Sequence, residues 1–135
     1  MKPNQCFLVV GDEVANISNP TNKGYEILDC NIAIEQVSDE NGERKARLRD
    51  NSIKVKLRNL PTAEITEWGL TRGKFLDCAI CFFEKDNKQP EVMILKQATC
   101  VNLKFNYDRK GEIQSSTEFS LCPKKLIVEG IELDN

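Results

Sequence analysis

Six cysteines carry the most specific chemistry that this chain offers. They are Cys6, Cys30, Cys78, Cys81, Cys100 and Cys122. Cys78 and Cys81 have the Cys-x-x-Cys spacing of redox pairs and zinc sites. The sequence around them, however, is typical of a strand, in which residues three apart point to opposite faces. No second pair exists to complete a zinc site. The cysteines are therefore predicted to be reduced and structural, each acting as a small buried hydrophobe.

The 135 residues contain no histidine. That absence removes the commonest general base, the commonest metal ligand and every Ser-His or Cys-His nucleophile pair. No glycine-rich phosphate loop and no pair of catalytic carboxylates stands out either. The sequence thus predicts a protein that is not an enzyme and that has no cofactor and no metal. A thiol enzyme using Cys78 or Cys81 is the weakest alternative.

Charge and hydropathy exclude two further classes of partner. Nineteen basic and twenty-one acidic residues give a net charge of -2, which argues against nucleic acid held by phosphate neutralisation. No stretch approaches the roughly 20 apolar residues of a membrane span, so no membrane insertion is predicted. The first apolar run, Cys6 to Val10, is too short for an export signal. We therefore expect no signal peptide and a cytoplasmic location, where thiols stay reduced.

The segment from Ser38 to Asn51 is unusually charged and contains the turn dipeptide Asn41-Gly42. It predicts either a long protruding hairpin loop or a bulged strand pair. A solvated loop tip is the simpler interpretation, and an arm that contacts another molecule is the sharper one. The candidate contact residues are Asp39, Gly42, Arg44, Lys45, Arg47 and Arg49.

Residues 99–130 predict a two-faced β-ribbon. Apolar and polar residues alternate from 101 to 107 and again from 113 to 121, so each strand would bury one face and expose the other. Asp108 to Gly111 form the turn between them. Pro123 ends the second strand because it lacks a backbone N–H.

Shorter alternating or apolar runs predict the remaining strands, at 6–10, 25–37, 53–57, 74–85, 91–96 and 126–128. In the run at 25–37, Leu28, Cys30, Ile32 and Ile34 are expected to share one face. Residues 13–23 have the composition of an exposed loop. Eight or nine strands in 135 residues indicate one mainly β domain, a barrel or sandwich.

One helix interrupts this pattern, between Leu60 and Thr71. Pro61 suits the first helical turn, Thr62 can cap it, and Ile65 and Trp68 share a face that must pack on the sheet. The predicted core residues are Ile65, Trp68, Phe82, Val101, Leu103 and Phe119.

The order of residues in the ribbon resembles the C-terminal third of the type VI secretion tube protein Hcp, in the TssD branch of Bacteroides-like bacteria. The matching positions are Cys100, Val101, Tyr107, Asp108, Gly111, Lys124, Lys125 and Gly130. Further matches are Cys30 with the loop Asp39 or Glu40, Gly42 and Arg44, the helix ITEWGL, and the strand CFFEKD. The resemblance covers most of the chain from Gly24 to Leu133. Residues 13–23 look like an insertion, and Phe105 stands where the tube branch has a polar residue.

This resemblance implies a fold and an assembly. Its fold is an Hcp-like β-barrel of two antiparallel sheets with one short flanking helix, in a single domain over residues 1–135. Six copies would form a ring, and edge strands left open would help to close it. Rings would stack into a tube that carries effectors and is secreted through the apparatus, with sheath, spike and effector proteins as partners. The lumen-facing candidates are Asn102, Lys104, Asn106, Gln114, Ser116 and Glu118. A monomeric β-barrel that binds a small ligand, or a cargo adaptor, remains the alternative.

Overall fold

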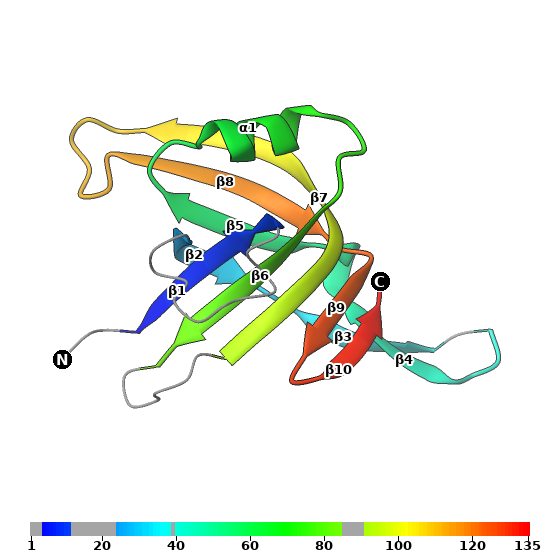
Figure 1. Ribbon diagram of the computed structural model, residues 1–135. Coiled ribbons are helices and arrows are strands. Elements are labelled where there is room, and N and C mark those ends of the chain that lie inside the picture. Colours follow the sequence, from blue (N-terminus) through cyan, green and yellow to red (C-terminus); the bar gives the residue numbers. More distant parts are fainter. Residues whose placement is uncertain (1–3, 12–23, 39, 85–90) are drawn as a thin grey trace.

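The computed structural model describes residues 4–11, 24–38, 40–84 and 91–135 (Figure 1). The predicted insertion at 13–23, Asp39 and the turn at 86–90 lie outside these ranges. The described strands are β1 (Gln5–Val10), β2 (Tyr25–Asn31), β3 (Ile34–Ser38), β4 (Arg44–Leu48), β5 (Ile53–Arg58), β6 (Leu76–Phe83), β7 (Glu91–Tyr107), β8 (Ser115–Cys122), β9 (Lys125–Val128) and β10 (Ile131–Asp134). A 3-10 helix, η3 (Arg49–Asn51), follows β4, and the α-helix is α1 (Ala63–Leu70).

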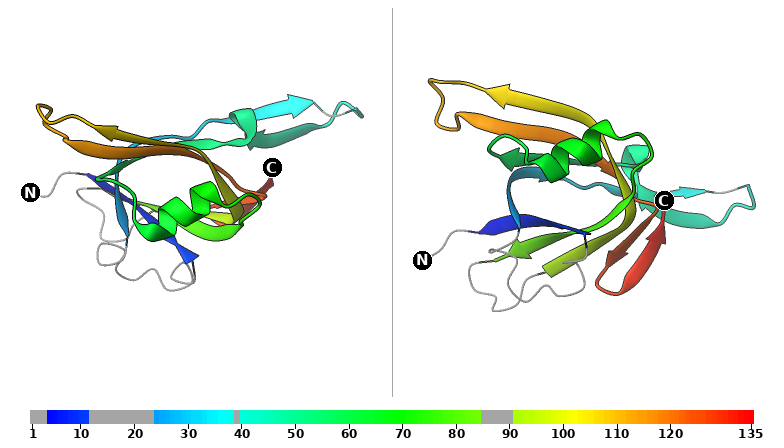
Figure 2. Two further views of the ribbon diagram at one scale, coloured as in Figure 1. Left: turned by 90° about the horizontal axis from the view of Figure 1, so that it is seen from above. Right: turned by 45° about the horizontal axis from the view of Figure 1, so that its top comes forward.

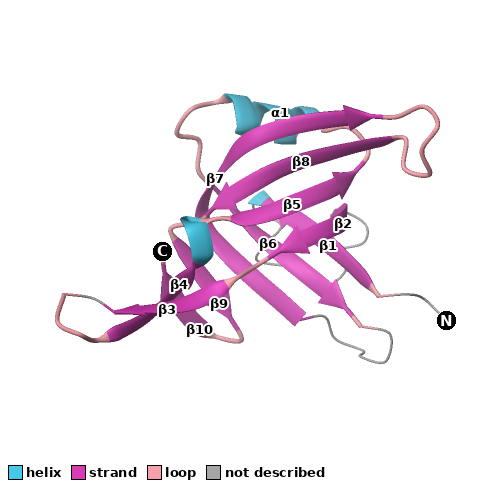
Figure 3. Cartoon of the chain, turned by 180° about the vertical axis from the view of Figure 1, so that it is seen from behind, coloured by secondary structure: helices cyan, strands magenta, loops and turns pink. Residues whose placement is uncertain are grey.

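Six antiparallel strands close into a barrel in the order β7, β6, β1, β2, β5, β8, because β8 pairs back onto β7. β9 and β10 extend from β7 outside this circuit, and β3 and β4 form a separate two-stranded sheet. Figure 3 shows both additions at the same side of the barrel. The prediction of a mainly β barrel with one short helix is confirmed.

β7 pairs with three other strands, β6, β8 and β9. The sequence predicted separate strands at 91–96 and 101–107, but the structure has one curved strand of 17 residues that pairs with β6 and β9 along its first half and with β8 along its second (Figure 1). Left-handed backbone at Gln97 (φ 48°) and Asn102 (φ 58°) accompanies shifts in its pairing register. The Asp77 carboxylate accepts a 2.9 Å bond from the Gln97 backbone N–H, which holds the first irregularity in place.

The predicted strand at 25–37 is two strands, and its expected core face is confirmed for Cys30 and Ile32, which pack against the core, but not for Leu28 and Ile34. A bulge between Ile27 and Asp29 shifts the alternation, so Ile27 is buried and Leu28 is only partly covered. The chain then leaves the barrel after Asn31 and enters β3, where Ile34 is 46% exposed.

The helix forms where the sequence places it. The Thr62 hydroxyl accepts a bond from the Ile65 backbone N–H, at 3.4 Å, and caps α1. Ile65 and Trp68 are buried against the barrel, and Trp68 Nε1 donates to the Ala98 carbonyl at 3.1 Å. α1 therefore lies over β7 (Figure 1).

The other predicted core residues differ in burial. Phe119 is buried, whereas Phe82 and Leu103 are partly buried and pack against the main core. Val101 is not a core residue, because it is 36% exposed. Its neighbour Cys100 pairs with Leu121 and points inward instead, so Val101 points out.

Candidate assembly surfaces

The cysteines do not form a reactive site. All six thiols are free, and Cys78 belongs to the main core while Cys81 belongs to a second cluster with Val9 and Ala79. The pair thus lies on opposite faces of β6. Burial raises the pKa of the Cys6 thiol to about 12 and that of Cys81 to about 11. At neutral pH these thiols are protonated, which makes them poor nucleophiles. Within the described ranges, no group of three or more potential ligands from His, Cys, Asp and Glu could hold a metal ion.

The charged segment is a projecting strand pair. β3 and β4 pair from Ile34 opposite Leu48 to Ser38 opposite Arg44. This hairpin, called the arm below, points away from the barrel (Figure 2). Glu35 forms 3.4 Å ion pairs with both Arg47 and Arg49.

The base of the arm is fixed to the rest of the molecule. Leu48 is 1% exposed, and the Asn135 side-chain amide donates to the carbonyls of Asn51 and Pro123 at 3.1 and 2.8 Å. At the outer end, Gly42, Arg44 and Lys45 are exposed. The arm therefore presents its cations on a strand pair that is anchored at one end.

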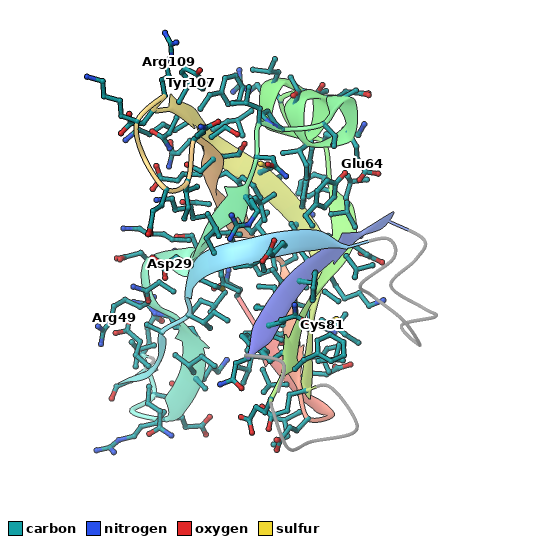
Figure 4. All side chains as sticks on the ribbon, turned by 90° about the vertical axis from the view of Figure 1, so that its left-hand side faces the viewer. Asp29, Arg49, Glu64, Cys81, Tyr107 and Arg109 are labelled. Carbon is teal, nitrogen blue, oxygen red and sulfur yellow. The ribbon has the colours of Figure 1, made fainter. Side chains whose placement is uncertain are left out.

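A polar face covers the outside of the sheet formed by β2, β5, β8 and β7. Cross-strand pairing aligns Asp29, Lys56, Glu118 and Lys104 in one row across it. Lys104 Nζ lies 3.8 Å from a Glu118 oxygen, and the Asn106 amide donates to the same carboxylate at 2.7 Å. A hollow of about 270 Å³ opens on this face. Figure 4 shows Asp29 on β2, facing outward.

The lumen-facing candidates only partly coincide with this face. Asn102, Lys104 and Glu118 line the hollow. Ser116 is only 3% exposed, because the strands on either side and the Asn106 amide, which donates to it at 3.3 Å, cover it. Gln114 lies before β8, in the connection from β7.

Sequence reasoning missed the contribution of β5 to the polar face. Lys54 and Lys56 line the hollow beside the ribbon residues. Their alternation with Ile53 and Val55 identified a polar side of that strand. What the alternation could not supply is the pairing of β5 with β8, from Ile53 opposite Leu121 to Arg58 opposite Ser116.

Large apolar side chains are exposed at the outer end of the β7–β8 ribbon. Leu60, Phe105 and Tyr107 are 53, 54 and 69% exposed, and we call them the ribbon-end patch. Phe105 and Tyr107 share one side of β7, and Tyr107 pairs with Ser115 of β8. The Asn59 backbone N–H donates to the Ser115 carbonyl at 3.1 Å, which holds the neighbouring Leu60 close to this end of the ribbon. The prediction that this side of the strand is buried fails here: Phe105 is exposed although its partner Thr117, and Leu57 of β5 beyond Thr117, are both buried.

The family model for "Hemolysin coregulated protein Hcp (TssD)" matches residues 4–135. The chain belongs to the Hcp (TssD) family. No curated protein matches it closely enough to count as a relative. The expected Hcp membership is thus confirmed, over nearly the whole chain.

Solved Hcp structures share this fold at low sequence identity. Hcp1 from Flavobacterium johnsoniae is 21% identical, with 97% of this chain and 99% of that chain covered and a TM-score of 0.73. Hcp1 from Salmonella typhimurium is 12% identical, with 98 and 92% covered and a TM-score of 0.70. A chain of the sheath/tube terminator of the PVC extracellular contractile injection system is 14% identical, with 93% of each chain covered and a TM-score of 0.56.

Barrel closure limits how this Hcp-family chain can present strand edges. Each of the six barrel strands has a partner on both sides over part of its length. In the described part of the chain, unpaired edges remain on β3, β4 and β10, along the outer half of β7, and along β2 beyond its short pairing with β1. No helix among the described residues has the length and apolar character to cross a membrane.

Proposed function

We propose that this chain is a tube subunit of a type VI secretion system, which assembles as rings of six copies that stack and carry effectors in their lumen. The family match over residues 4–135 is the observation that carries the proposal. The similarity to a tube terminator of a contractile injection system supports it at the level of the fold.

The shape of the subunit supports assembly. Its accessible surface is 9136 Å², whereas a compact monomer of 15.3 kDa would expose roughly 7,100 Å². The arm and the ribbon contribute to this surface, because they project from opposite ends of the barrel (Figure 2). Interfaces of about 800 Å² on each of three surfaces are of ordinary size for a stable complex.

Each surface has a proposed role. The polar face lines the lumen, because it is the broad hydrophilic side of a continuous sheet. The ribbon-end patch contacts a ring neighbour, because exposed aromatic side chains of this size mark interaction sites. The arm, with Gly42, Arg44, Lys45, Arg47 and Arg49, reaches the next ring. A head-to-tail ring also requires a second surface on each subunit, which receives the ribbon-end patch of its neighbour.

The packing of the barrel favours this role over a ligand carrier. Leu8, Ile53, Ile80 and Leu121 are fully buried in one continuous core, which side chains from opposite walls fill. The raised thiol pKa values likewise favour a structural protein over a thiol enzyme. In this proposal the subunit folds in the cytoplasm and leaves the cell through the apparatus.

Light scattering coupled to size exclusion tests the proposal directly. We expect a mass about six times that of the 15.3 kDa chain, and negative-stain images should show rings. A protein that stays monomeric at high concentration, with no rings on the grid, would overturn the proposal.

A further inference from the structure

The charges of the polar face are arranged in two unlike rows. In the row Asp29, Lys56, Glu118 and Lys104, each cation lies across from a carboxylate. Opposite charges in cross-strand positions stabilise a sheet and cancel each other's field at a distance. This row is therefore neutral as a whole.

The adjacent row has a single charge. Lys54 pairs across the sheet with Asn31 on one side and with Ser120 on the other. It is exposed, and it forms no ion pair within the ranges that the structure describes. Arg49, in the adjoining hollow of about 130 Å³, is paired with Glu35, and Asp50 lines that hollow together with Lys54. The hollow of about 270 Å³ is lined by three lysines and two carboxylates, and Lys54 is the lysine among them that has no carboxylate across from it in the sheet.

Neutral hydrogen-bonding groups surround this lysine. Asn31, Asn102 and Ser120 line the same hollow of about 270 Å³. Asn102 lies at the register shift between β7 and β8, where its backbone is left-handed (φ 58°), and its side chain is part of the lining of the hollow. An uncompensated ammonium beside two amides and a hydroxyl is a suitable site for a carboxylate, which accepts hydrogen bonds from all of them.

We propose that Lys54, with Asn31, Asn102 and Ser120, forms a subsite for carboxylate side chains of an acidic polypeptide segment. The inference rests on the proposed function, because the polar face becomes a channel wall only when rings form. A ring would repeat the subsite six times, so that one acidic segment could contact several copies and gain avidity.

A polypeptide fits this face better than nucleic acid does. Each copy offers one uncompensated cation, whereas a nucleic acid strand needs several cations to neutralise successive phosphates. Asp29 and Glu118 also lie within the same hollow and would repel a phosphate backbone. The carboxylates of an acidic peptide instead stand at the ends of separate, flexible side chains, so that one of them can reach Lys54 while the others turn away from those two groups.

The test uses the full-length protein and a fluorescein-labelled poly-glutamate peptide. Binding is followed by fluorescence anisotropy at low ionic strength, and the mass of each sample is measured by light scattering. Lys54→Glu and Lys54→Gln should weaken binding about tenfold or more, the effect of losing a hydrogen bond to a charged group, while Lys54→Arg should retain it. Lys110→Glu, at the exposed turn of the ribbon, makes the same charge change away from the face and should leave binding unchanged.

The outcomes separate this subsite from the proposed function. Rings that bind poly-glutamate equally well with and without Lys54, or that bind poly-lysine or oligothymidine more tightly, would overturn the subsite and leave the tube proposal standing. A monomeric protein whose poly-glutamate binding still depends on Lys54 would support the subsite and overturn the tube proposal.

Discussion

Replacing Phe105 by Ser should weaken ring formation while leaving the subunit folded. Phe105 is 54% exposed, which for a side chain of roughly 200 Å² leaves about 110 Å² open to a neighbour. At about 25 cal/mol per Å², burying that area contributes about 2.7 kcal/mol to each subunit contact. The dissociation constant of each contact should therefore rise about a hundredfold in the variant.

The part of Phe105 already covered in the monomer limits the cost to folding. That remainder, about 90 Å², corresponds to at most ~2 kcal/mol of unfolding free energy. Urea denaturation measures this cost, and circular dichroism shows whether the variant remains folded.

Sedimentation velocity over a dilution series measures the assembly. Phe105→Ser should dissociate at concentrations at which the wild type keeps its ring mass. Lys104→Ser is the matched control, because Lys104 is the residue before Phe105 on β7, lies on the opposite side and is also exposed. If Phe105→Ser keeps the ring mass through the same dilutions as the wild type, the ribbon-end patch is not a subunit contact.

Three further predictions concern the arm, the helix and the thiols. Replacing Arg44, Arg47 and Arg49 by Glu should reduce ring stacking seen by electron microscopy. The unfolding free energy should fall by only ~1 kcal/mol, because the two ion pairs to Glu35 are exposed. Stacks that stay intact would show that the arm does not contact the next ring. Trp68→Phe should lower the unfolding free energy by about 2 to 3 kcal/mol in urea, because the Ala98 carbonyl loses its buried donor, and an unchanged midpoint would contradict this. Burial raises the pKa of Cys6 and Cys100 from 9.0 to about 12. Between these pH values only the unfolded state ionises, so the unfolding free energy should fall as pH rises above 9. The unfolding free energy of Cys100→Ala should fall less steeply over this range, and a decline parallel to that of the wild type would refute the raised pKa of Cys100.

The sequence pattern was sufficient to predict those elements whose decisive residues all lie within one short segment. The helix could be predicted because Thr62, Ile65 and Trp68 supply the cap and the buried face within a single stretch. The burial of both faces of β6 was likewise evident from its unbroken apolar run, and residues 78–81 are all fully buried. The charged segment left a protruding hairpin loop or a bulged strand pair open, and the structure shows a projecting strand pair whose register from Ile34 to Ser38 has no bulge.

Features that depend on distant partners could not be predicted in the same way. Gln97 and Asn102 adopt positive φ without being glycine, so nothing in the sequence indicated that two strands are one bent β7. The polar face required the pairing of β5 with β8, whose paired residues are 58 to 68 positions apart in the sequence. Asp29 lies opposite the Cys30 face of its strand, as the alternation predicts, but it joined the polar face through the pairing of β2 with β5. In each case a long-range register, which single-sequence alternation does not encode, decided the outcome.

Closure of the barrel determines which forces are available for assembly. An open sheet could join its copies through backbone hydrogen bonds along free edges, but such edges also pair indiscriminately before assembly. Here the barrel strands satisfy most of their backbone groups within the chain. The arm, which keeps free edges, bears Arg44 and Lys45 at its exposed end, and charge of this kind discourages unplanned pairing. Side-chain surfaces such as the ribbon-end patch must therefore supply much of the association energy, which makes ring formation sensitive to single exposed residues such as Phe105.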